Sequence, residues 1–73
     1  MMYNYSKLRG RIIEIYGSLG AFAEALGVSR QTVSNLITGK RQFTANTIES
    51  WIEKLDIPAT EIGIYFFVQK VDK

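Results

Sequence analysis

The middle of this chain repeats one pattern three times: a serine or threonine suited to cap a helix is followed by apolar residues at helical spacing. The three capping positions are Ser18, Ser29 and Thr44. Gly27 and Gly39 close the first two stretches, in the place where a left-handed residue commonly ends a helix. Because caps and spacing agree in three successive stretches, the sequence predicts an all-α fold.

Four helices are expected, followed by a less regular C-terminal segment. The predicted helices cover residues 6–16, 18–26, 29–38 and 44–55, with Ser6 as the cap of the first. Pro58 suits the first position of a short fifth helix over residues 58–64. The aromatic and β-branched stretch 65–71 favours a short β-strand, which would have to pair with residues 2–5 or with a second subunit. We therefore expect one compact domain of four to five helices over residues 1–73.

The composition excludes several kinds of chemistry. The chain has no cysteine and no histidine, which rules out disulfides, the common soft-metal sites and thiol or histidine catalysis. It has no glycine-rich phosphate loop or paired carboxylates, so we expect no enzyme activity, cofactor or small-molecule effector. The longest apolar stretch, residues 62–68, is too short to span a membrane, and the first residues lack a signal-peptide core. We expect a cytoplasmic protein without a membrane partner.

Charge is distributed unevenly along the chain. Residues 1–41 carry six basic and two acidic side chains, whereas residues 42–73 carry three basic and five acidic ones. The basic half contains two of the three capped stretches. Such a field would attract phosphate to one side of the molecule, although ordinary solvated surfaces explain the charge equally well.

The stretch from Ser18 to Arg41 joins a short helix, a tight turn and a second helix, with the small Ala23 opposite Val33. This spacing resembles the helix-turn-helix of the phage repressor and Cro superfamily, over roughly residues 6–64. The matching positions are Ala23, Gly27, Val28, Ser29, Val33, Leu36, Gly39, Lys40 and Arg41. Three further groups, residues 21–23, 25–27 and 65–67, resemble short Cro-like regulators from phages of Gram-positive bacteria. Leu19 departs from the family, which commonly has glutamine there for a polar contact to the DNA backbone.

The resemblance implies that the helix over residues 29–38 enters the major groove of DNA. Its apolar residues, among them Val33 and Leu36, would face the core and leave a polar face outside. Amide side chains suit adenine, a guanidinium suits guanine, and a threonine methyl suits thymine. The expected base contacts are Arg30, Gln31, Thr32, Ser34 and Asn35. The expected contacts to the DNA backbone are Ser18, Ser29, Thr38, Lys40 and Arg41. An ordinary polar helix face is the alternative.

The aromatic segment near the C-terminus is expected either to cover a small core or to form a dimer contact. Its members are Tyr65, Phe66, Phe67 and Val68. The dimer contact is favoured, because one small core does not need so much aromatic surface. The C-terminal tail over residues 65–73 is then part of a homodimer interface.

These expectations together predict a regulator that binds a double-stranded DNA operator as a symmetric dimer. Two recognition helices about 34 Å apart would occupy successive major-groove turns and block a promoter. No effector domain follows the DNA-binding part, which favours a Cro-like repressor. The alternative is a protein-interaction module, such as an antitoxin or antirepressor. Only a phosphate-contacting protein would bind duplex DNA with an affinity that falls steeply as salt rises.

Overall fold

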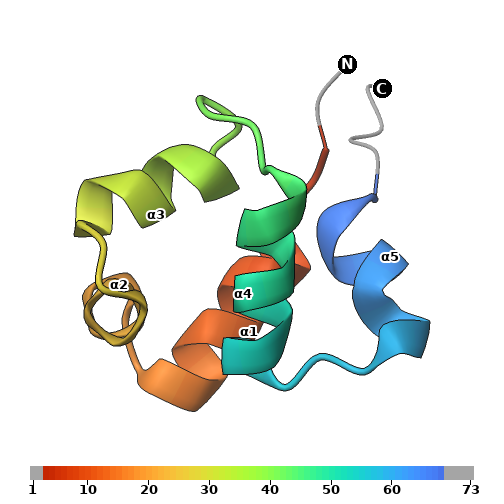
Figure 1. Cartoon of the computed structure of the whole chain (residues 1–73), viewed down its shortest axis with the longest axis horizontal. Coiled ribbons are helices and arrows are strands. Elements are labelled where there is room, and N and C mark those ends of the chain that lie inside the picture. Colours follow the sequence, from red (N-terminus) through yellow and green to blue (C-terminus); the bar gives the residue numbers. More distant parts are fainter. Residues whose placement is uncertain (1–2, 69–73) are drawn as a thin grey trace.

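Five α-helices joined by short turns make up most of residues 3–68, the part of the chain that the computed structural model describes (Figure 1). They are α1 (Ser6–Tyr16), α2 (Leu19–Leu26), α3 (Arg30–Ile37), α4 (Ala45–Leu55) and α5 (Ile62–Phe66), with the 3₁₀ turn η1 (Ala59–Glu61) before α5. The prediction of an all-α domain with four to five helices is confirmed. None of the described helices is long and apolar enough to cross a membrane.

The three predicted side-chain caps are present. Each cap hydroxyl accepts a hydrogen bond from the backbone N–H three residues later, at 3.1 Å for Ser18, 3.1 Å for Ser29 and 3.2 Å for Thr44. These bonds satisfy N–H groups that the first turn of a helix leaves without a partner. Gly27 ends α2 with a φ of 77°, a left-handed conformation that glycine adopts without the penalty of a Cβ.

The first helix begins differently from the prediction, with Tyr5 at the N-cap position and no side-chain cap. Ser6 is already helical, and its backbone N–H donates to the side-chain Oδ1 of Asn4 at 2.9 Å. The fifth helix also differs from its prediction. Pro58 precedes η1, and the helical segment continues past residue 64 to Phe66.

The predicted C-terminal strand is wrong for Tyr65 and Phe66, which form the last residues of α5. Their side chains are 7% and 1% exposed, so burial against the other helices overrides their local preference for a strand. Residues 69–71 of the predicted strand lie outside the described residues. The expected approach to the N-terminal segment is present in one backbone bond, from the N–H of Asn4 to the carbonyl of Val68 at 2.6 Å.

A single hydrophobic core joins the helices. In Figure 1, α4 stands at the centre with α1 behind it, α2 and α3 on one side and α5 on the other. All five helices contribute buried side chains, including Leu8, Phe22, Val33, Trp51 and Phe66. The ring of Trp51 makes edge contacts with Phe22 and Phe43, at centroid distances of 4.8 and 4.9 Å. This core holds α2 and α3 in a fixed position relative to α4.

Candidate functional site

The α2–α3 corner has the geometry that its sequence predicts. Ala23 is 2% exposed and Val33 is fully buried, so the two helices meet closely where a small side chain faces a larger one. The N–H of Val28 in the turn donates to the carbonyl of Ala23 at 3.0 Å. That bond and the left-handed Gly27 fix the direction in which α3 leaves α2.

The polar face of α3 lies at the surface of the monomer. Arg30 and Gln31 are exposed, whereas Ser34 and Asn35 are half-buried. The side-chain amide of Gln31 donates to Oδ1 of Asn35 at 2.9 Å. The two amides predicted to read bases therefore bind each other here, and a DNA contact would use their remaining groups or break this bond.

Thr32 is the predicted base contact that lies apart from this face. Its hydroxyl lies 2.9 Å from the hydroxyl of Ser29, and its backbone N–H binds the same Ser29 oxygen. The side chain is half-buried and lines a groove toward α4. Thr32 and Ser29 thus bind each other at the start of α3, and this is their structural role in the monomer.

The predicted contacts to the DNA backbone are spread over the starts of α2 and α3 and the loop after α3. Ser18 lies beside Arg30, a predicted base contact, over Gly20, where an added methyl group would lie 3.9 Å from the Ser18 hydroxyl and 3.7 Å from Cδ of Arg30. Lys40 and Arg41 are exposed in the loop after α3. The three predicted hydroxyl contacts all have structural partners: Ser18 caps α2, Ser29 caps α3, and the Thr38 hydroxyl donates to the carbonyl of Ser34 at 2.7 Å.

A groove of about 420 Å³ runs between the α2–α3 turn and α4, and we call it the α3–α4 groove. Its buried or partly buried apolar members are Leu26, Leu36 and Trp51. Val28 lines it as well and is 43% exposed. Among the described residues that line it, Arg41 alone is charged. A concave surface that combines apolar residues with polar groups is typical of binding sites.

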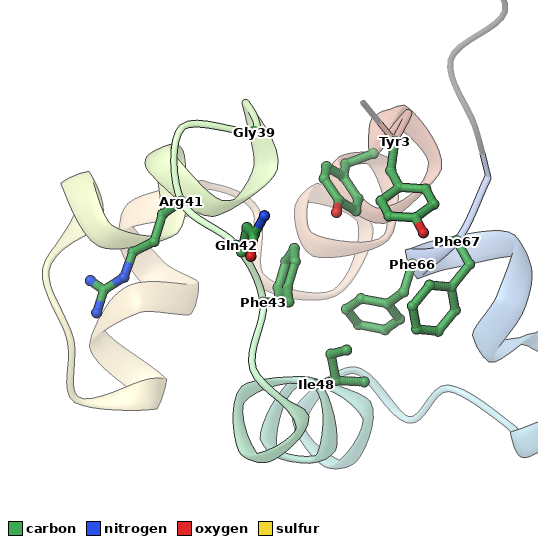
Figure 2. Close-up of a pocket in the computed structure, with 9 residues that line it drawn as sticks. Tyr3, Gly39, Arg41, Gln42, Phe43, Ile48, Phe66 and Phe67 are labelled. Carbon is green, nitrogen blue, oxygen red and sulfur yellow. The ribbon is translucent and has the colours of Figure 1, made fainter. Parts of the chain in front are cut away.

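A second hollow has a volume of about 300 Å³ (Figure 2). It is enclosed by the N-terminal segment, by the loop that precedes α4, and by the end of α5. Phe43, Phe66 and Phe67 line it together with Tyr3 and Tyr5. Figure 2 shows the Arg41 side chain extending away from these rings. Burial, and to a lesser extent the neighbouring Tyr3, raise the pKa of the Tyr5 phenol, which therefore stays protonated at neutral pH.

The four predicted dimer contacts divide into two pairs. Tyr65 and Phe66 are buried in the monomer and form part of its core, as in the alternative in which this segment covers a small core. Their rings have little surface left to offer a second subunit. Phe67 and Val68 are 50% and 39% exposed, and a dimer contact through them stays a prediction.

Sequence reasoning missed the α3–α4 groove. Residues from α2, α3, the following loop and α4 line it, so no local pattern marks it. The one available signal is Val28, an apolar residue in the predicted turn between the two helices. Over residues 3–68, acidic side chains form no group of three or more that could hold a metal ion.

Comparison with known proteins identifies relatives of this chain. It is similar to the modulator of repression of the temperate bacteriophage TP901-1 from Lactococcus lactis, whose solution structure matches with a TM-score of 0.80. The two are 36% identical, over 99% of this chain and 97% of the other. A search of curated proteins found no match. The fold is thus that of a small phage regulator. Residues 1–69 match the model of a family described as proteins of unknown function, DUF739, and the chain belongs to this family.

Proposed function

We propose that this chain is a non-enzymatic modulator of transcriptional repression, which acts in the bacterial cytoplasm by binding a repressor protein. The observation that carries the proposal is the likeness to a phage modulator of repression, at 36% identity over nearly the whole of both chains. The match is not confined to one segment, because it covers 99% of this chain and 97% of the other. The exposed apolar side chains Ile64, Phe67 and Val68, which are neighbours in sequence at the end of α5, support a protein partner, because such groups gain from burial in an interface.

A titration of the labelled chain with the purified phage repressor encoded in the same genome tests this proposal. We expect saturable binding with a fixed stoichiometry, and a change in the affinity of that repressor for its operator when the chain is added. The chain is also titrated with a mixed-sequence DNA duplex at about 50 and 200 mM salt, because the salt dependence of binding reports contacts to phosphate. The proposal fails if the repressor does not bind the chain.

Sequence-specific binding of double-stranded DNA as a dimer is the second candidate. It is favoured by the exposed polar face of α3, with Arg30 and Gln31, and by the exposed Lys40 and Arg41 in the next loop. In this case two copies of α3 would enter successive major grooves and occlude a promoter. A Cro-like helix-turn-helix regulator of this kind needs no other protein to reach its operator.

Gln31→Ala tests this second candidate. The substitution should weaken binding to a selected operator by about 1–3 kcal/mol and relax the sequence preference, with the helical circular-dichroism spectrum unchanged. An equal loss on every duplex would contradict a role in base reading.

Sedimentation of Phe67→Glu beside the parent chain tests the dimer, and a monomeric parent would contradict it.

A further inference from the structure

We infer that the α3–α4 groove is the docking site for the protein partner, and that it receives an apolar side chain flanked by a carboxylate. The inference rests on the proposed function, which supplies the partner's class, and adds where and how the partner binds. Three features of the groove carry it: its apolar base, its charge and its concave shape.

The groove offers apolar surface that the monomer does not cover completely, mainly at Val28. Trp51 and Leu36 are 2% and 5% exposed and belong to the core, while Leu26 is partly buried. Val28 lines the same groove and leaves 43% of its surface exposed. An apolar side chain entering here would cover Val28 and rest on residues that the core already holds rigid, which lowers the entropic cost of binding.

The charge of the groove is one-sided. Among its described lining residues the remaining polar members carry hydroxyls or amides, such as Thr32, Asn46 and Ser50, and none carries a carboxylate. Within residues 3–68, the recorded ion pair joins Arg11 to Glu14 and does not involve Arg41. The exposed guanidinium of Arg41 thus has both the reach and the free donors to hold a partner carboxylate.

The shape of the groove favours a protein over duplex DNA as the occupant. Arg41 alone would suit a phosphate equally well. A duplex, however, presents a convex row of phosphates and sugars, and it has no side chain to fill an apolar hollow of about 420 Å³. A protein segment can place an apolar group in the hollow and a carboxylate at its edge at the same time.

Two substitutions in the groove, each with a matched control, test the inference. Ser50→Trp fills the groove from an exposed position of α4, and Thr60→Trp adds the same ring at an exposed position of η1. Arg41→Glu reverses the groove's charge, and Lys40→Glu makes the same reversal one residue away, at a side chain that does not line the groove. The full-length variants are titrated with the same phage repressor and with the mixed-sequence duplex. Circular dichroism checks that each variant is folded.

We expect Ser50→Trp and Arg41→Glu to weaken repressor binding by about tenfold or more, and both controls to stay within about threefold of the parent. If the parent itself does not bind the repressor, the proposed function fails. If the parent binds and the two groove variants bind as tightly, the groove is not the docking site. If the groove variants lose only duplex binding, the groove serves a nucleic acid and the inference is overturned.

Discussion

Arg11 joins the first helix to the end of the fourth. Its Nε donates to the carbonyl of Leu55 at 3.0 Å, and a second guanidinium nitrogen donates to the carbonyl of Asp56 at 3.2 Å. These carbonyls lie where α4 ends in a left-handed Asp56, with a φ of 51°, and the last carbonyls of a helix have no partner within it. The third nitrogen holds the exposed Glu14 at 3.0 Å. One side chain thus replaces helix bonds that α4 cannot make.

Replacement of Arg11 by alanine should lower the free energy of unfolding by about 2 kcal/mol, because two charge-assisted bonds to backbone carbonyls are lost. Urea unfolding followed by circular dichroism measures the change. Glu14→Gln is the control: it removes the exposed ion pair alone and should cost less than about 0.5 kcal/mol. Equal losses for the two variants would assign the effect to the ion pair.

At the scale of elements, the sequence predicts best where local chemistry determines the structure. The capped helices α2, α3 and α4 follow from Ser18, Ser29 and Thr44 together with the apolar spacing. The C-terminal strand was predicted wrongly because Tyr65 and Phe66 favour strands locally, whereas the core that buries them is built by distant residues. The α3–α4 groove could not be predicted for the same reason, since it exists only after α4 has packed beside the α2–α3 turn.

The start of α1 gives an element-scale prediction. Because Oδ1 of Asn4, and not the Ser6 hydroxyl, accepts the N–H at the start of this helix, Asn4→Ala should cost about 1 kcal/mol of stability. Ser6→Ala should be neutral or slightly stabilising, since alanine is the better helix former inside the first turn. Thermal unfolding of both variants compares them directly. The reverse order would restore Ser6 as the cap.

At the scale of the whole molecule, Phe43 connects parts that are distant in sequence. Its ring makes edge contacts with Tyr5 at 5.2 Å, Trp51 at 4.9 Å and Phe66 at 5.3 Å. These partners belong to the N-terminal segment, α4 and α5. Phe43 itself lies in the loop between α3 and α4, so it also fixes the loop that carries Arg41. The half-buried ring of Phe43 therefore connects the core to the loop beside the candidate docking site.

Phe43→Ala should lower the free energy of unfolding by about 3 kcal/mol, a large share of the stability of so small a domain, because three aromatic contacts are lost and a cavity opens beside Trp51. Trp51 is the chain's sole tryptophan, so its fluorescence during urea unfolding reports the change at this place. Tyr3→Ala is the control. It removes the outer edge contact with Phe67, at 5.8 Å, from a side chain 41% exposed, and should cost less than about 1 kcal/mol. Comparable losses would mean that the ring of Phe43 does not join the core as its contacts indicate. A large loss for Phe43 alone would show that this ring, although it lies in a loop, is part of the core.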